Sequence, residues 1–301
     1  MNECKVSVCV VTYNQQDFIY QCLDSLLNQK TNFVFEILVA DDFSTDGTRK
    51  ILEKFKRDNP EKVKLFLHEQ NIGAYNNFAF VHKMAKGKYV VHMDGDDYTL
   101  PGKLQVQADY LDKNENCNIV WHRAFTYKNE RYYQDNNSEI NYTQRTYDIV
   151  DLICNVTIGK NSTSMYRNDY KNSSWYNYYE LDFPANVLKL TDKGKTADFI
   201  KDGVYSVYRS GIGISQTQNH IIKIKIYKWL LQFYKDNLTE KSIINAKLFW
   251  QVVSDFRHLK KSFYYGFYAF FSTIIHFRVR SILEVRKRQF FIDNEFNEVK
   301  I

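Results

Sequence analysis

The sequence has 301 residues, of which 44% are hydrophobic and 25% are charged, a composition typical of a globular protein with one large or two modest domains. Its net charge of +6 is unevenly spread, because residues 223–301 hold 15 Lys and Arg against 7 Asp and Glu, whereas residues 1–222 hold 26 against 28. No apolar run reaches the roughly 18 residues that a membrane-spanning helix needs. We expect no signal peptide, since the first residues lead directly into a strand-like run. The five cysteines form no Cys-x-x-Cys pair, so we expect buried, reduced thiols, which favours the cytosol.

Strand-length apolar runs alternate with helical patterns through the first 125 residues. Strands are predicted at residues 6–12, 33–40, 62–67, 89–93 and 118–125. Helices are predicted between them, around residues 18–27, 51–55, 76–85 and 103–114. This alternation predicts an α/β fold with a doubly wound, mostly parallel sheet. Neither a Gly-x-Gly-x-x-Gly fingerprint nor a Walker loop is present, which argues against dinucleotide-binding and P-loop proteins.

The second half of the chain is less regular. We expect a loop or insertion at residues 127–147, a short helix at 147–155, and a turn followed by a strand at 158–167. Residues 204–213 are predicted to form a strand that runs into a loop. Several histidines show no metal-ligand spacing, and we expect most of them to lie on the surface or in the core, with His122 a candidate near the acceptor side; these are His68, His82, His92 and His122.

Polar residues follow three of the predicted strands where each strand ends. They are Thr12 after the first strand, Asp41 and Asp42 after the second, and Asp94, Asp96 and Asp97 after the fourth. Because the carboxyl ends of parallel strands lie along one edge of a sheet, we expect these side chains to converge on one cleft. Ligation by oxygen alone suits Mg²⁺ or Mn²⁺, which in turn hold substrate phosphates. The alternative is a polar turn that caps the next helix.

The order of several motifs resembles that of the family 2 glycosyltransferases, inverting enzymes of the GT-A fold that use nucleotide-diphosphate sugars. The resemblance covers about residues 5–215. It is carried by Val10-Val11-Thr12-Tyr13-Asn14, the Asp-Asp-x-Ser-x-Asp-x-Thr element from Asp41 to Thr48, the loop Asn71-Ile72-Gly73, Asp94-Gly95-Asp96-Asp97, Pro101 with Lys103-Leu104-Gln105-Val106-Gln107, and Tyr208-Arg209-Ser210-Gly211-Ile212-Gly213. It implies a GT-A domain at 1–220, with a nucleotide-sugar half at about 1–115 and an acceptor half at about 116–220. Residues 221–301 then form a helical, basic extension.

The resemblance also implies which residues bind the donor. The nucleotide-sugar contacts are assigned to Thr12, Tyr13, Asn14, Asp41, Asp42, Asn71, Gly73, Asp94, Gly95 and Arg209. Thr12 and either Asp41 or Asp42 are expected to hold the base, although Asp42 is also a candidate helix cap. Asp94, Asp96 and Asp97 are expected to hold Mn²⁺ or Mg²⁺ against the diphosphate. Ser210 stands where the family often has His, and Arg209 offers a planar fork that suits a phosphate.

An inverting transfer needs a base that deprotonates the acceptor hydroxyl. In the family this base is an acidic residue that often precedes an aromatic residue and a proline. Asp182-Phe183-Pro184 resembles that element, so Asp182 is the predicted base and Glu180 the alternative. The structural alternative for Asp182 is a helix N-cap.

The tail at 221–301 lies outside the strong resemblance. It contains an aromatic stretch at residues 263–271, followed by Arg278, Arg280 and further cations. Such a stretch suits a helix that lies in an anionic membrane interface, and the alternatives are a subdomain packed on the core or a dimer contact. We therefore expect a cytoplasmic protein held peripherally on the inner face of the cytoplasmic membrane. Nucleic acid is disfavoured as a partner, because the acidic cleft edge repels phosphates without a metal.

Together these features predict an inverting, metal-dependent hexosyl- or N-acetylhexosaminyltransferase that moves a sugar from a UDP-sugar to a glycan or lipid-linked glycan. A sugar-nucleotide pyrophosphorylase is disfavoured, since it needs a Gly-rich, basic first loop. The alternative from another class is a non-catalytic sugar-nucleotide- or glycan-binding subunit of a membrane-associated polysaccharide assembly complex.

Overall fold

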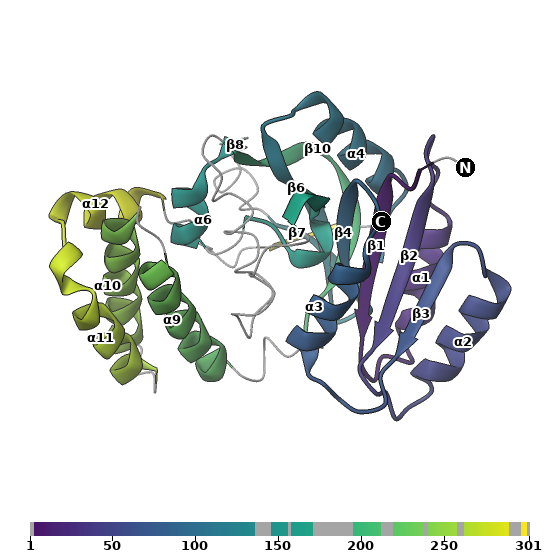
Figure 1. The fold of residues 1–301 in the computed structure, drawn as a ribbon, viewed down its shortest axis with the longest axis horizontal. Helices are drawn as coiled ribbons and strands as arrows, with labels where there is room; N and C mark the ends of the chain where they lie inside the picture. The colour runs from purple at the N-terminus through teal and green to yellow at the C-terminus, as the bar shows by residue number, and fades with distance from the viewer. Residues whose placement is uncertain are drawn as a thin grey trace.

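The computed structural model describes residues 3–135, 146–155, 158–170, 195–211, 219–236, 240–257, 262–288 and 296–299. Its first half alternates strands and helices as predicted (Figure 1). The elements are β1 (Val6–Thr12), α1 (Ile19–Leu27), β2 (Phe35–Asp41), α2 (Thr48–Asp58), β3 (Val63–Leu67), α3 (Ala74–Met84), β4 (Tyr89–Asp94), β5 (Tyr98–Thr99) and α4 (Lys103–Lys113). All five cysteines are free, and four of them are buried.

Helices cover both faces of the central sheet because alternate strand residues point to opposite faces. Strand β1 pairs in parallel with β2 and with β4, and β2 pairs in parallel with β3. Val8 and Val10 of β1 join the apolar cluster that contains α1, α2 and α4. Cys9, between them, joins the other cluster, which contains Val81 of α3. The predicted doubly wound arrangement is therefore present.

The second half of the chain extends the sheet with antiparallel pairings and with one long parallel pairing. Its elements are β6 (Cys117–Lys128), β7 (Arg131–Asp135), β8 (Thr146–Tyr147), α6 (Ile149–Asn155), η1 (Asn161–Thr163), β9 (Met165–Arg167), η2 (Asn168–Tyr170) and β10 (Thr196–Arg209). With β11 (Phe296–Val299) included, the strand order is β11-β7-β6-β9-β4-β1-β2-β3, and β10 pairs with β5, with β6 in the long parallel pairing, and with β8. Strand β9 is antiparallel to both β4 and β6, so the sheet is mixed beyond β4.

The expectation of a loop at residues 127–147 is wrong for its first part. Strand β6 continues to Lys128 and turns through Asn129 (φ 51°) and Glu130 (φ 61°) into β7. Positive φ at both central residues is the geometry of a two-residue hairpin turn whose twist matches that of its strands. The polar, tyrosine-rich pattern hid this hairpin, in which the rings of Tyr127 and Tyr132 lie 4.9 Å apart across the strands.

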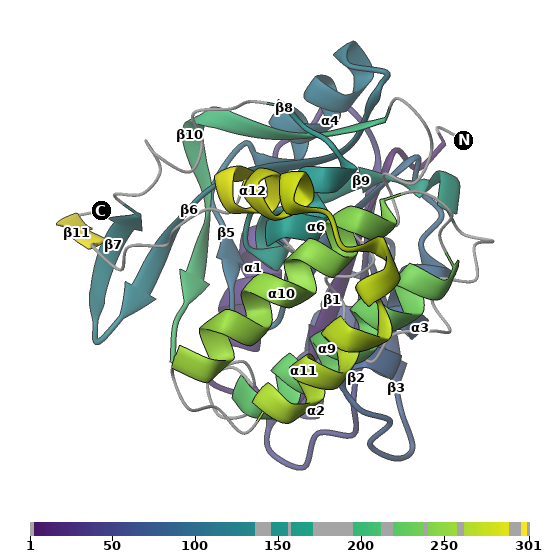
Figure 2. The ribbon, with the colours of Figure 1, turned by 90° about the vertical axis from the view of Figure 1, so that its left-hand side faces the viewer.

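The C-terminal helices form a separate layer at the end of the molecule opposite α2 (Figure 1). They are α9 (Asn219–Asp236), α10 (Lys241–Arg257), α11 (Phe263–Ser272), η4 (Ile274–His276) and α12 (Val279–Arg288). Figure 2 looks at this end. Helix α10 packs on α6, where Lys247 donates to the carbonyl of Cys154, and Arg288 pairs with Asp148 at 2.9 Å. Apolar residues of these helices share one cluster with the sheet, so this subdomain is packed on the core.

The extension is not helical to its end, because β11 (Phe296–Val299) returns to pair antiparallel with β7. Within the described residues, no helix is both long enough and apolar enough to cross a membrane.

Asp112, near the end of α4, ties this helix to the starts of β1 and β4. Its carboxylate accepts from Lys88 Nζ at 2.7 Å and Tyr89 Oη at 2.6 Å, and lies 2.6 Å from Lys5 Nζ. Burial acts in the opposite direction, but these hydrogen bonds and the charge of Lys5 hold the pKa of Asp112 well below its usual range. The carboxylate is a third exposed, so solvent screens much of this interaction.

We predict that Asp112→Asn lowers the free energy of unfolding by about 1 kcal/mol at pH 7. Because the folded-state pKa lies below that of the unfolded chain, this stabilisation is complete above about pH 4 and is lost as the pH falls through the folded-state value. Urea denaturation of both proteins at pH 7 and at pH 2, where most of this stabilisation is lost, measures the difference. The control is Asp109→Asn, one turn earlier, whose carboxylate accepts from the neutral Gln105 at 2.9 Å. An Asp112→Asn deficit that is equal at both pH values would contradict the prediction.

Candidate functional site

The carboxyl ends of β1, β2 and β4 lie side by side, as the sequence predicts. Thr12 is the register partner of Asp41, and Val11 is the register partner of Asp94. Backbone hydrogen bonds continue for one residue beyond β2 and β4, because Asp42 N donates to Thr12 O at 3.0 Å and Gly95 N donates to Val11 O at 2.9 Å. The polar residues that follow three separate strands are therefore brought to one edge of the sheet.

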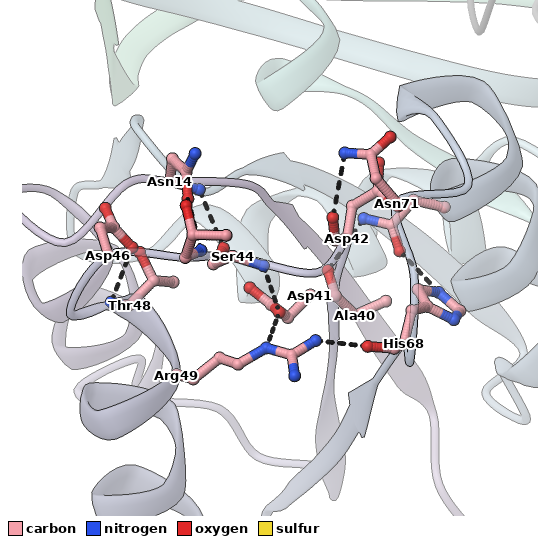
Figure 3. Close-up of polar contacts among 12 residues, drawn as sticks. Asn14, Ala40, Asp41, Asp42, Ser44, Asp46, Thr48, Arg49, His68 and Asn71 are labelled. Atoms are coloured by element: carbon pink, nitrogen blue, oxygen red, sulfur yellow. Dashed lines mark hydrogen bonds and ion pairs between the residues drawn. The ribbon is translucent and has the colours of Figure 1, made fainter.

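Asp41 and Asp42 are both buried, but they hold different parts of this edge (Figure 3). Asp41 Oδ2 accepts from Arg49 Nε of α2 at 2.7 Å and from Ser44 N at 3.0 Å. Asp42 Oδ1 accepts from Ile72 N at 2.7 Å, and its carbonyl accepts from Asn71 Nδ2 at 3.1 Å. Burial raises the pKa of Asp42, against the hydrogen bonds from Ile72 and Gly73. Asp41 thus anchors its own loop to α2, whereas Asp42 anchors the Asn71–Gly73 loop.

The loops after β1 and β2 are joined to each other by hydrogen bonds through Asn14 (Figure 3). Asn14 N donates to Ser44 Oγ at 2.9 Å, and Asn14 Oδ1 accepts from Thr45 N at 2.8 Å. Asn14 has a φ of 51°, a conformation that Asn tolerates better than most residues. Tyr13, beside it, remains 46% exposed. Asn14 therefore lies against the loop that follows Asp41, and the role of Tyr13 and Asn14 in nucleotide-sugar binding stays a prediction.

Asp94, Asp96 and Asp97 form the acidic cluster at the end of β4. Asp94 is the most exposed of the three, with 35% of its side chain exposed. Its Oδ1 lies 3.1 Å from His92 Nε2, and its Oδ2 accepts from Ser162 Oγ at 3.2 Å. Burial would raise the pKa of Asp94, but the interaction with His92 and the two hydrogen bonds lower it below its usual value. Asp94 is thus held in its charged form.

Asp96 and Asp97 are buried close to Asp94 and are harder to ionise. Burial, with the charge of Asp94 added, raises the pKa of Asp96 to about 6. Burial and the charges of Asp94 and Asp96 raise the pKa of Asp97 well above its usual range. Like charges confined at one strand end repel one another, and a bound cation would relieve that repulsion.

Arg209, at the end of β10, holds the acidic loop in place. Its backbone N donates to Asp97 Oδ1 at 2.8 Å, and its guanidinium donates to the carbonyl of Asp96 and to Gln21 Oε1. The guanidinium also lies over the rings of Phe18 and Tyr98, at 5.1 and 5.0 Å from their centroids. Arg209 is therefore at the predicted site, with its guanidinium engaged by the protein.

The donor atoms at this edge suit a hard divalent cation that is shared with a substrate. In the described part of the chain, four buried side-chain oxygens at this edge of the sheet make no hydrogen bond: Thr12 Oγ1, Gln15 Oε1, Asp41 Oδ1 and Asp97 Oδ2. Among the described residues, no group of three or more His, Cys, Asp or Glu converges on a metal position. That is compatible with Mg²⁺ or Mn²⁺, because such ions are commonly bound by one or two carboxylates together with substrate phosphates.

Two residues that contact Asp94 were not predicted as site residues. His92 was expected to be a surface or core histidine, and it is indeed buried, yet it links Asp94 to His82 (3.0 Å), which in turn lies 2.6 Å from Tyr166 Oη. The available signal was the i, i+2 spacing, which places His92 and Asp94 on one side of β4. Ser162 is 68 residues away from Asp94 and carries no local signal.

Other predicted site residues have different outcomes. Gly73 begins α3 with a φ of 85°. Gly95 packs so closely that an added Cβ would lie 3.0 Å from Thr12 Cβ and 2.5 Å from Gln15 Oε1. His122 is buried inside the sheet, where burial and the charge of Lys103 hold its pKa well below its usual value. Asp182 and Glu180 lie outside the described residues.

Comparison with known proteins identifies one family. The family model described as "Glycosyl transferase family 2" matches residues 7–172. An uncharacterized protein of Mycobacterium bovis is 30% identical over 186 residues, which is 62% of this chain and 51% of that protein. A poly(ribitol-phosphate) beta-glucosyltransferase of Bacillus spizizenii is 38% identical over 97 residues, which is 31% of this chain and 15% of that protein. The chain thus spans about half the length, or less, of these two relatives.

The solved structure of S. aureus TarS 1–349 in complex with UDP-GlcNAc is similar over nearly the whole chain. It covers 98% of this chain and 96% of that one, with a TM-score of 0.60 and 19% sequence identity. At this identity the similarity shows the fold, which is GT-A with a helical C-terminal region, and no more.

We predict that Ser162→Ala weakens Mn²⁺ binding, measured by calorimetry with a nucleoside diphosphate present, by several-fold. The substitution removes the hydroxyl that donates to Asp94 Oδ2 and accepts from Asp94 N at 3.1 Å. The free energy of unfolding should fall by about 1–2 kcal/mol. The matched control is Ser164→Ala, since this buried hydroxyl donates to Asn161 O at 2.9 Å. It should lose similar stability and keep its Mn²⁺ affinity, and equal Mn²⁺ affinities for the two variants would contradict the assigned role of Ser162.

Proposed function

Because this chain belongs to glycosyl transferase family 2, we propose that it is an inverting glycosyltransferase that uses a UDP-sugar. The transferred group is a hexosyl or N-acetylhexosaminyl residue, and the acceptor is a hydroxyl of a glycan or lipid-linked glycan. The observation that carries the proposal is the convergence of Thr12, Asp41, Asp42 and the acidic cluster at one sheet edge, with unpaired buried oxygens among them. The relative named as a poly(ribitol-phosphate) beta-glucosyltransferase supports a polymer acceptor.

The nucleoside is bound where the loops after β1 and β2 meet. The Asp42 carboxylate accepts a hydrogen bond from the base, and the Thr12 hydroxyl donates or accepts a second one. The ring of Tyr13, the next residue in the chain after Thr12, is exposed. Asp41 is the alternative: its Oδ2 is ion-paired with Arg49, but its Oδ1 is buried without a hydrogen bond among the described residues, whereas Asp42 Oδ1 accepts from the backbone N–H of Ile72 in the Asn71–Gly73 loop.

The diphosphate lies beside Asp94, Asp96 and Asp97. These carboxylates would hold Mn²⁺ or Mg²⁺, as GT-A glycosyltransferases commonly do, and the cation would offset the negative charge that develops on the leaving group. The protein's own contribution is orientation: His92 and Ser162 fix Asp94, and Arg209 fixes the loop that carries Asp96 and Asp97. Fixed groups of this kind need no rearrangement when the sugar is transferred.

The transfer itself is a single displacement. The acceptor oxygen forms a bond to the anomeric carbon as the bond from that carbon to the UDP oxygen breaks. The proton of the acceptor hydroxyl passes to Asp182, or to Glu180 if that residue is the base. Support for Asp182 rests on its resemblance to the family's Asp-aromatic-Pro element. We also propose a cytoplasmic location, which the five free cysteines favour.

We predict that one class of nucleotide sugar raises the melting temperature only when Mn²⁺ or Mg²⁺ is present, and that this class is the UDP-sugars. Asp96→Asn should abolish the metal-dependent part of the shift, because it removes a carboxylate from the acidic cluster. The measurement is a thermal-shift panel of UDP-, GDP- and dTDP-sugars with and without metal. Asp58→Asn, an exposed position on α2, is the matched control and should behave as wild type. Nucleotide binding that ignores both the metal and Asp96 would refute the site.

We predict that Asp182→Asn lowers turnover by about a hundredfold or more while the donor affinity stays within about twofold, since a general base contributes roughly 10²–10⁴-fold. Turnover is measured as transfer to an acceptor or as hydrolysis of the donor, and donor affinity by calorimetry. Glu180→Gln is the matched comparison and should keep most of the activity. The reverse result would make Glu180 the base. A wild-type protein that binds the donor and never turns it over would instead be the non-catalytic binding subunit.

A further inference from the structure

Helix α11 presents an aromatic stripe to solvent. Its four most exposed large side chains follow the i, i+3, i+4, i+7 spacing of a single helix face: Tyr264 (82% exposed), Phe267 (47%), Tyr268 (65%) and Phe271 (49%). The opposite face is firmly packed, since Ala269 is buried and a Cβ added at Gly266 would lie 2.4 Å from a ring atom of Tyr227. The helix is therefore seated on α9 and α10 by its small residues, with its aromatic face turned outward.

The elements that follow α11 in the chain also expose apolar side chains. Ile275 in η4 is 77% exposed, and Val279 and Leu283 of α12 are 64% and 57% exposed. These elements lie at the end of the molecule that faces the viewer in Figure 2, opposite the end formed by α2. We call the seven residues Tyr264, Phe267, Tyr268, Phe271, Ile275, Val279 and Leu283 the apolar patch.

Cations accompany the apolar patch. Residues 262–288 contain five Lys and Arg and one Asp or Glu, which is Glu284. Glu284 already lies 3.4 Å from Arg288, whereas Arg278, Arg280 and Lys287 are exposed beside the patch. The surface thus combines exposed aromatic rings with a local excess of positive charge.

We propose that the apolar patch docks the protein on an anionic membrane surface. Helix α11 has 10 residues and is about 15 Å long, which is too short to cross a bilayer but suits a helix that lies in the interface plane. Tyr and Phe favour this boundary because their rings insert among the lipids, and the hydroxyl of Tyr stays at the headgroup level. Arg278, Arg280 and Lys287 then face the lipid phosphates, each adding electrostatic attraction.

A second copy of the chain fits this surface less well. A two-fold symmetric contact would place the patch against itself and would bring the same exposed arginines together without compensating carboxylates. An anionic lipid surface supplies the missing negative charge. This proposal does not depend on the catalytic site, so either one can fail without the other.

The test is co-sedimentation of the full chain with vesicles. Wild-type protein should bind mixed vesicles that contain equal amounts of phosphatidylcholine and phosphatidylglycerol. Binding to vesicles of phosphatidylcholine alone, or to the mixed vesicles at high salt, should be at least about tenfold weaker. Two variants test the apolar and the electrostatic contribution separately. The aromatic variant combines Tyr264→Ser, Phe267→Ser, Tyr268→Ser and Phe271→Ser. The charge variant combines Arg278→Glu and Arg280→Glu. Each should weaken binding at least about tenfold.

The matched controls are Lys50→Glu with Arg57→Glu on exposed positions of α2, and Tyr20→Ser, a tyrosine that is 56% exposed on α1. Both should bind vesicles within about twofold of wild type. Thermal melting checks that every variant is folded, and the charge variant changes only exposed side chains. The proposal is overturned if wild type does not bind anionic vesicles, or if the controls lose binding as much as the patch variants. It is also overturned if light scattering finds a dimer that the patch variants dissociate, since the occupant is then a second copy.

Discussion

The in-register parallel pairing of β1 with β2 and β4 is the constraint on which the site depends. Each strand contributes an apolar run that is buried on both faces, and each run ends at a polar residue. Pairing Thr12 with Asp41, and Val11 with Asp94, places those ends next to one another. A slip of one residue in any of these strands would exchange the two apolar clusters on opposite faces, so the same burial that stabilises the sheet also determines where the polar ends meet.

The acidic cluster is stabilised by contacts from distant parts of the chain. Burial, together with repulsion among three carboxylates within four residues, raises the pKa of Asp96 and Asp97. Arg209 from β10 and Ser162 from η1 donate to this loop, and His92 contacts Asp94 from within β4. Residues beyond position 160 therefore hold the acidic cluster in place, although the carboxylates themselves come from the first 100 residues.

The C-terminal helices are integrated into the molecule while presenting an apolar surface. Helix α10 packs on α6, and its Lys247 donates to the carbonyl of Cys154. Strand β11 then pairs with β7, which joins the end of the chain to the edge of the sheet. Because these helices and β11 are fixed to the sheet in this way, docking through the apolar patch would hold the sheet in one orientation on the bound surface.

The sequence by itself determined the α/β class, the positions of β1 to β4 and the edge at which their polar ends meet, because periodic burial and strand-end residues are local signals. It also indicated the family, because several short motifs occur along the chain in the order that is typical of that family. It could not identify the β6–β7 hairpin, since a polar, tyrosine-rich stretch lacks the alternation of a half-buried strand, nor the return of β11 to the sheet. Only the tertiary structure showed that Asp41 is ion-paired with Arg49, that Arg209 is engaged by the Asp96–Asp97 loop, and that Ser162 donates to Asp94. These contacts join residues that are distant along the chain or that have several available partners, and only packing selects among them.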